Sequence, residues 1–110
     1  MSKKYPTLSR YTRSALELLG SQIKLARKRR GWSESALAER AGINRSTVNN
    51  IESGNPRVAI GTCFEVASLV GIPLFSDDPS VVARELTRSN ELLALMPKKI
   101  QPTRRIDDDF

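Results

Sequence analysis

Histidine is absent from this 110-residue chain, and cysteine occurs once, as Cys63. Without histidine the chain lacks the usual general base, the Ser-His-Asp and Cys-His arrangements, and every zinc site built on imidazole. A single cysteine excludes an internal disulfide framework and a cysteine-cluster metal site. We therefore expect a protein with no catalytic residues, no metal and no cofactor, and not an enzyme.

Long apolar runs are also absent. No stretch approaches the roughly 18 apolar residues that cross a bilayer. No apolar segment follows the basic residues at the N-terminus, so we expect no signal peptide. The length suits one domain with one modest core, because domains contain about 100–150 residues.

Charge is distributed unevenly along the chain. The net charge is +6, but residues 1–57 carry twelve Lys and Arg against four Glu, whereas residues 58–110 carry six against eight acidic residues. A basic half attracts a polyanion, and nucleic acid is the simplest one for such a protein. A solvated surface without a partner is the alternative. An anionic membrane is disfavoured, because no exposed aromatic or leucine stripe accompanies the basic residues.

Capping residues and apolar spacing predict an all-α chain of five to six helices. Ser14 and Glu17 have the spacing of a capping box, Ser33 and Asn44 are good N-caps, and Asp78 precedes a proline at a first helical position. Residues 72–75 form an apolar segment that we interpret as a single helical turn. The predicted helices span residues 15–30, 34–41, 45–53, 60–70 and 79–96.

These elements predict four segments. Residues 1–14 are a flexible basic arm, residues 15–76 the helical domain, residues 77–96 a C-terminal helix and residues 97–110 a flexible tail. Core positions are expected on each helix of the domain, with Phe64, Ala67 and either Leu69 or Val70 facing inward on the fourth. The predicted inward positions of the first helix are Leu16, Leu19, Ile23, Ala26 and the aliphatic stem of Arg30.

The two short helices of residues 34–53 predict a helix-turn-helix unit, because only three residues separate them. Ala38 allows the helices to cross closely, and Gly42 suits a left-handed turn. Val48 and Ile51 face inward on the second helix. Its outward positions are all polar and none is acidic, as base edges and phosphates require. These outward residues are Asn44, Arg45, Ser46, Asn49, Asn50 and Ser53.

Residues 20–75 resemble the helix-turn-helix domain of the Cro/C1 (Xre) repressor superfamily, which implies a lambda-repressor-like fold. A narrower resemblance, to HipB-type antitoxins, rests on Leu25–Gly31, Gly54–Val58, Pro97-Lys-Lys and the closing Arg105–Phe110. The segments that match the superfamily are Ile23–Arg27, Gly31–Ser33, Leu37–Gly42, Arg45–Val48, Ile51–Gly54 and Val70–Leu74.

The HipB-type resemblance implies a homodimeric repressor and antitoxin that binds palindromic double-stranded operator DNA in its own promoter. It also implies a complex with a HipA-like serine/threonine kinase toxin. The alternative is a stand-alone Cro/C1-type transcriptional regulator without a toxin. Either function predicts a cytoplasmic, nucleoid-associated protein with no membrane partner.

The superfamily resemblance assigns DNA contacts to particular residues. The start of the third helix points into the major groove, and Arg45 and Asn50 are the best candidates for guanine and adenine respectively. The predicted base contacts are Asn44, Arg45, Ser46, Asn49 and Asn50. The predicted phosphate contacts are Ser33, Glu34, Thr47, Ser53, Asn55 and Arg57.

Glu34 departs from the superfamily pattern, which usually has glutamine there to bridge a phosphate and the recognition helix. A carboxylate beside a phosphate is unfavourable without a cation, so either Glu34 supports Arg45 or the phosphate contact is lost. Arg27 and Glu52 match a superfamily pair that links the first and third helices. That pair either orients the recognition helix or is a plain structural salt bridge.

Other residues have both ordinary and functional interpretations. Trp32 and Cys63 are expected to pack against the core. The acidic end of the tail, residues 107–109, is either a solubilising terminus or a docking peptide that binds a partner through Phe110. An apolar stripe on the last helix is core, a dimer seam or a toxin-binding face; its residues are Val82, Leu86, Leu93 and Met96.

Overall fold

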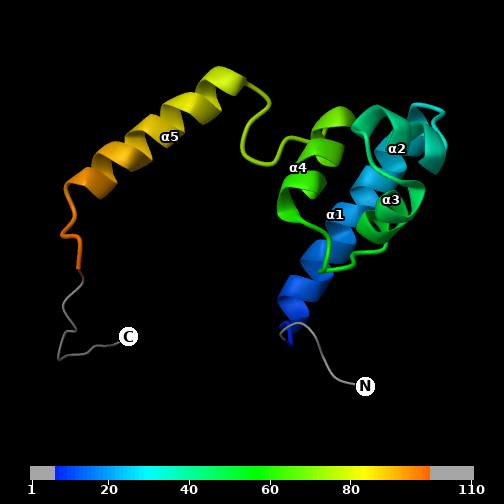
Figure 1. Cartoon of the computed structure of the whole chain (residues 1–110), viewed down its shortest axis with the longest axis horizontal. Coiled ribbons are helices and arrows are strands. Elements are labelled where there is room, and N and C mark those ends of the chain that lie inside the picture. Colours follow the sequence, from blue (N-terminus) through cyan, green and yellow to red (C-terminus); the bar gives the residue numbers. More distant parts are fainter. Residues whose placement is uncertain (1–6, 100–110) are drawn as a thin grey trace. The chain divides into compact units, whose positions relative to one another are not determined.

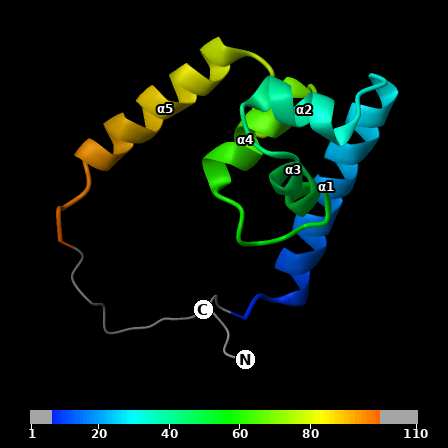
Figure 2. The same ribbon diagram turned by 45° about the vertical axis from the view of Figure 1, so that its right-hand side comes forward.

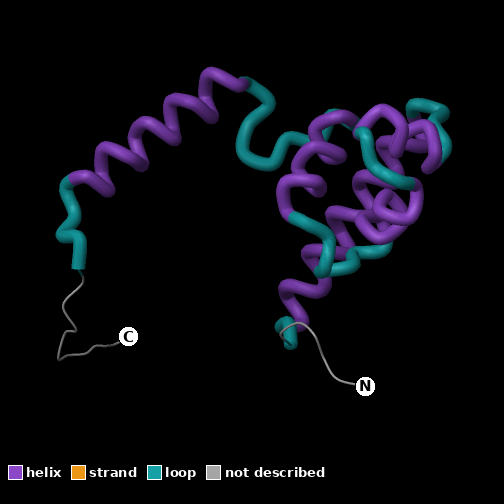
Figure 3. Tube along the Cα trace, in the orientation of Figure 1, coloured by secondary structure: helices purple, strands orange, loops and turns teal. Residues whose placement is uncertain are grey.

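The computed structural model describes residues 7–99, which contain five α-helices joined by loops, with no strand among these residues (Figures 1 and 3). The all-α prediction is therefore confirmed. The helices are α1 (Arg10–Arg29), α2 (Glu34–Ala41), α3 (Arg45–Glu52), α4 (Ile60–Leu69) and α5 (Pro79–Ala94). The chain divides into two units, Met1–Asp77 and Asp78–Phe110. Over the described range, no helix combines the length and apolar character needed to cross a membrane.

Helix α1 begins at Arg10, five residues before the predicted start. Ser9 has extended backbone angles, and its hydroxyl oxygen accepts a hydrogen bond from the Thr12 N–H at 3.2 Å. Ser9 therefore caps the helix, and Ser14, predicted as the cap, lies inside it. The residues that follow Ser9 extend the helix into part of the predicted flexible arm.

The other helix starts agree with the prediction. Those of α2, α3 and α5 depend on local side-chain caps, whereas α4 begins at Ile60 without one. Ser33 accepts a hydrogen bond from the Ala36 N–H at 3.0 Å, and Asn44 accepts one from the Thr47 N–H at 2.9 Å. Asp78 caps α5 through Ser80. The predicted end of α2 agrees with the structure, and the other predicted helix ends extend one or two residues too far, as is usual where terminal turns fray.

Eight buried apolar residues from α1, α2, α3 and α4 form the core of the first unit. Within this unit α2 packs against both α3 and α4, and α1 packs against α3, which Figures 1 and 2 show from two directions. Trp32 and Cys63 pack against the core as predicted. The buried residues are Ile23, Leu37, Ala38, Val48, Ile51, Val66, Ala67 and Val70.

Two predictions for the fourth helix and the segment after it are wrong. Phe64 is 39% exposed, whereas Val66 is fully buried. Val66, Ala67 and Val70 define the inward arc at α4, and Phe64 lies about a third of a turn from the centre of that arc. Residues 72–75 form no helical turn: Ile72 packs against the core, while Phe75 is 83% exposed.

Candidate nucleic-acid interface

The turn between α2 and α3 is held by backbone conformation and hydrogen bonds. Gly42 has φ 70° and ψ 31°, the left-handed conformation that a side chain makes costly. The N–H of Ile43 donates to the Ala38 carbonyl at 3.0 Å, which is the closure expected after a left-handed helix end. Asn44 then caps α3 immediately. The helix-turn-helix predicted from residues 34–53 is therefore present.

Helix α3 has one buried and one exposed side. Val48, Ile51 and Glu52 are buried, and they attach the helix to the core. All five predicted base-contacting residues are exposed, and they are the N-cap of α3 and four of the first six residues of that helix. The structure therefore brings these side chains together, and the Glu34 carboxylate lies beside two of them.

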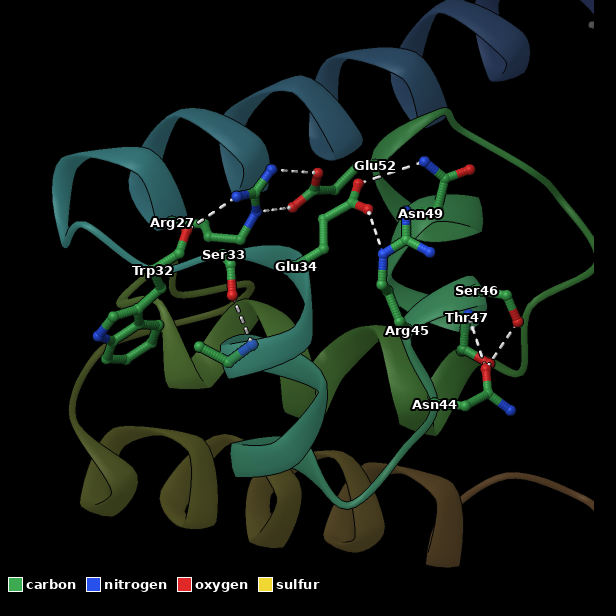
Figure 4. A network of polar contacts seen from close by, with 11 residues as sticks. Arg27, Trp32, Ser33, Glu34, Asn44, Arg45, Ser46, Thr47, Asn49 and Glu52 are labelled. Atoms are coloured by element: carbon green, nitrogen blue, oxygen red, sulfur yellow. Dashed lines mark hydrogen bonds and ion pairs between the residues drawn. The ribbon is translucent and has the colours of Figure 1, made fainter.

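A buried ion pair joins α3 to α1. The Arg27 guanidinium donates to both carboxylate oxygens of Glu52, from Nε at 2.7 Å and from Nη2 at 3.0 Å. Nη1 of Arg27 donates to the Trp32 carbonyl at 2.8 Å, and Figure 4 shows the three groups converging. The hydrogen bond with Glu52 raises the pKa of Arg27, so the guanidinium stays charged. The predicted link between the first and third helices is thus an observed contact.

Gly20 is a second attachment point for α3, and the sequence analysis did not identify it. A Cβ at Gly20 would lie 2.5 Å from the carbonyl oxygens of both Ile51 and Glu52. The end of α3 therefore lies directly against the backbone of α1. A glycine inside a helix, where it costs stability relative to alanine, was the signal available in the sequence.

Glu34 lies beside α3 and contacts two of its residues. Its Oε1 is 3.5 Å from Nε of Arg45, and its Oε2 accepts a hydrogen bond from Nδ2 of Asn49 at 3.2 Å (Figure 4). Glu34 therefore contacts Arg45, as the first of the two alternatives requires, and its phosphate contact stays a prediction. The contact with Asn49 was not predicted, although Arg45 and Asn49 are four residues apart and so share one side of the helix.

Asn44 organises the hydroxyl groups at the start of α3. Its Oδ1 accepts hydrogen bonds from the Ser46 hydroxyl at 2.8 Å and from the Thr47 hydroxyl at 2.9 Å, besides the capping bond from the Thr47 N–H (Figure 4). The Nδ2 donors of Asn44 take no part in these bonds. The Thr47 hydroxyl hydrogen is directed at Asn44, so Thr47 must turn its hydroxyl to donate to a phosphate.

The remaining predicted phosphate contacts lie at the start of α2 and after α3. Ser33 uses its hydroxyl oxygen as an acceptor, which leaves the hydroxyl hydrogen for a ligand. The Ser53 hydroxyl donates to the Asn50 carbonyl at 3.1 Å. Asn55 Oδ1 accepts a hydrogen bond from the Arg57 N–H at 2.8 Å. The Nδ2 donors of Asn55 take no part in this bond.

Three other candidate features remain: the Cys63 thiol, the predicted anchor Phe110 and a metal site. Burial raises the pKa of the Cys63 thiol, which keeps it protonated and unreactive. The predicted partner anchor Phe110 lies outside the described residues. Within residues 7–99, no group of three His, Cys, Asp or Glu side chains is placed to hold a metal ion.

Residues 23–75, just under half of the chain, match the family model described as helix-turn-helix. The match is to a helix-turn-helix family of the Cro/C1 type, and the all-α architecture with its helix-turn-helix is consistent with a lambda-repressor-like fold. Domains of this class bind DNA in transcription regulators.

Two kinds of relatives share this domain. Antitoxin HipB of Escherichia coli strain K12 is 27% identical over 74 residues, which are 67% of this chain and 84% of that protein. Antitoxin HipB of Escherichia coli O6:H1 is 26% identical over the same length, 79% of that protein. The HTH-type transcriptional regulator SutR of strain K12 is 31% identical over 55 residues, which are 50% of this chain but 31% of SutR.

Proposed function

We propose that this chain is a sequence-specific, homodimeric repressor that acts as a HipB-type antitoxin. It binds a palindromic operator in its own promoter, represses its operon and forms a complex with a HipA-like serine/threonine kinase toxin. The observation that carries the DNA-binding part is the polar outer face of α3, held at its far end by Arg27–Glu52 and Gly20. The similarity to HipB over most of that protein's length supports the antitoxin part.

The proposed contacts follow from the exposed chemistry. Arg45 pairs with guanine and Asn50 with adenine, while Asn44, Ser46 and Asn49 contact neighbouring base edges. The groups at the ends of α2 and α3 contact phosphates and fix the docking of the domain. These phosphate contacts are Ser33, Thr47, Ser53, Asn55 and Arg57, with Glu34 acting through Arg45.

A second candidate function is a stand-alone transcriptional regulator. The match to SutR, which is confined to about the length of the helix-turn-helix domain, favours it. Both candidates predict operator binding without catalysis at the nucleoid in the cytoplasm. They differ in whether the chain binds a toxin. The experiment that separates them is co-purification of the chain with the protein encoded by the neighbouring reading frame, followed by a kinase assay of that protein.

Two single substitutions test the DNA-binding face by separating base reading from phosphate binding. Arg45→Ala should weaken operator binding by about 1–3 kcal/mol per half-site and relax the preference at one base position. Arg57→Ala should weaken binding to all sequences alike. It should also reduce the slope of log affinity against log salt concentration by about one unit. Titrations with specific and nonspecific duplexes at several salt concentrations measure both effects. If both variants keep the parental ratio of specific to nonspecific affinity, the assignment is wrong.

A further inference from the structure

Glu34 is the carboxylate that stands beside the proposed base-contacting residues Arg45 and Asn49. As the first residue of α2 it reaches across the turn to α3, and its side chain is 17% exposed while that of Arg45 is 67% exposed. One carboxylate oxygen faces Nε of Arg45, and the other accepts from Nδ2 of Asn49 (Figure 4). The carboxylate therefore holds two outward side chains at once.

The chemistry of the carboxylate decides how Asn49 is oriented. An ionised carboxylate only accepts hydrogen bonds, whereas an asparagine amide carries a donor end and an acceptor end. The donor end of Asn49 must therefore face Glu34, and the acceptor Oδ1 is the end left for DNA. Without Glu34, the amide could present either end to a base.

The same contact restricts Arg45. With Nε beside the carboxylate, the two terminal nitrogens Nη1 and Nη2 remain for DNA. A pair of parallel N–H donors matches the O6 and N7 acceptors of guanine. The ion pair also limits the rotamers that the exposed arginine can adopt, so that its donors point in a preferred direction.

We propose that Glu34 is a positioning residue that sets the hydrogen-bond polarity of the recognition helix, with Arg45 as a donor pair and Asn49 as an acceptor. An acceptor in the major groove selects a base with an exocyclic amino group, adenine or cytosine. Arg45 and Asn49 are about 6 Å apart along the axis of α3, which corresponds to about two base-pair steps. Each operator half-site therefore contains a guanine and, about two base pairs away, an amino-bearing base. This inference rests on the proposed function.

Selection of binding sites from a random duplex library, performed with the full chain and with Glu34→Gln, tests the proposal. Glutamine can donate as well as accept, so the Asn49 amide is free to turn. We expect the parental preference for adenine or cytosine at one position, about tenfold for a hydrogen bond to a base edge, to fall below about threefold. The guanine preference of Arg45 should weaken as well, and the remaining positions should change little. Glu39→Gln is the matched control, because it removes the same charge from an exposed position of α2.

Asn49→Ala supplies an independent check, since it should lose the preference at the same base position as Glu34→Gln. In the free chain, the Asn49 side-chain amide resonances should shift with Glu34→Gln and stay unchanged with Glu39→Gln. Identical base preferences for the parent and Glu34→Gln, or effects of Glu34→Gln and Asn49→Ala at different positions, overturn the inference alone. A parent that enriches no sequence overturns the proposed function and the inference together.

Discussion

Two glycines inside helices have opposite surroundings, although the sequence alone does not distinguish them. A Cβ at Gly20 would meet carbonyl oxygens of α3 at 2.5 Å, whereas a Cβ at Gly61 on α4 would meet nothing within 4 Å. Both glycines cost helix stability through backbone entropy. At Gly20 the close approach of α3 leaves no room for a side chain, which explains why a glycine is needed there. No such contact explains Gly61.

Gly20→Ala should therefore destabilise the domain, whereas Gly61→Ala should not. We expect Gly20→Ala to destabilise the domain by about 1–3 kcal/mol, because the overlap is with backbone that must move. Gly61→Ala should be neutral or should stabilise by roughly 0.5–1 kcal/mol. Urea unfolding followed by circular dichroism measures both. Gly20→Ala should also weaken DNA binding, because it shifts α3; equal stability of the two variants would contradict this account.

The buried pair of Arg27 and Glu52 allows a prediction about single and double substitutions. Arg27→Met leaves the Glu52 carboxylate buried and unpaired, so it should cost about 3–5 kcal/mol. The double variant Arg27→Met, Glu52→Leu buries no charge and should be more stable than the single variant. The free energies of unfolding decide the matter. A double variant as unstable as Arg27→Met would mean that the lost attachment of α3, and not the unpaired charge, dominates.

At the scale of elements, local caps determine where α2, α3 and α5 begin. Each cap is a short side chain that accepts from an N–H two or three residues later. Such contacts depend on neighbours in the sequence only, which is why these starts could be predicted. Helix α1 has two admissible caps, Ser9 and Ser14, and local rules do not choose between them.

The cap of α5 predicts a pH dependence. The N–H and hydroxyl of Ser80 donate to Oδ1 of Asp78 at 2.9 and 2.8 Å, which lowers the pKa of Asp78. A lowered pKa in the folded state means that the capping contribution is complete above the unfolded value of about 3.9 and is lost as the pH falls through the folded value. Protection of the Ser80 amide from hydrogen exchange should therefore decrease below about pH 4. Asp78→Asn should retain the cap without this pH dependence, and Asp77→Asn should behave as the parent.

At the scale of the whole molecule, the described chain consists of a four-helix unit and a separate helix. No residue of α5 is buried in the described structure, and Leu86 and Leu93 are more than half exposed. Within its own unit the predicted stripe is therefore exposed. Core, dimer seam and partner surface remain its interpretations.

The proposed dimer predicts the form of the footprint on DNA. One recognition helix for each chain covers too few bases for tight binding, so two domains should protect two half-sites about 34 Å apart, one helical turn. Footprinting on the promoter of its own operon, with the size of the complex measured by light scattering, checks both parts. Protection of one asymmetric site by a monomer would exclude the two-fold arrangement.

The tail of residues 97–110 is proposed to bind the kinase partner through Phe110 and the acidic residues before it. Its basic and acidic blocks nearly balance, +4 against −3, so its deletion should change operator affinity by less than about twofold. The same deletion should weaken the kinase complex at least about tenfold, or about 1.4 kcal/mol, because it removes the proposed contacts of Phe110 and the aspartates. Calorimetry of the truncated chain with each partner measures both. Loss of DNA affinity with unchanged kinase affinity would make the tail a DNA-binding arm.

The sequence by itself determined the features that depend on near neighbours. Apolar spacing and local caps predicted the all-helical chain, the helix-turn-helix at residues 34–53 and the polar surface of α3. The superfamily resemblance added the pairing of Arg27 with Glu52. Each of these is encoded within a few residues or within a recognisable motif.

Only the tertiary structure decided the features that depend on how helices are oriented. Glu34 contacts Asn49 because of the angle between α2 and α3, and Phe64 is exposed because packing sets the rotation of α4. The role of Gly20 depends on the distance between α1 and the end of α3. Spacing along a helix specifies which residues share a side, but the packing of the whole core determines which neighbour that side meets.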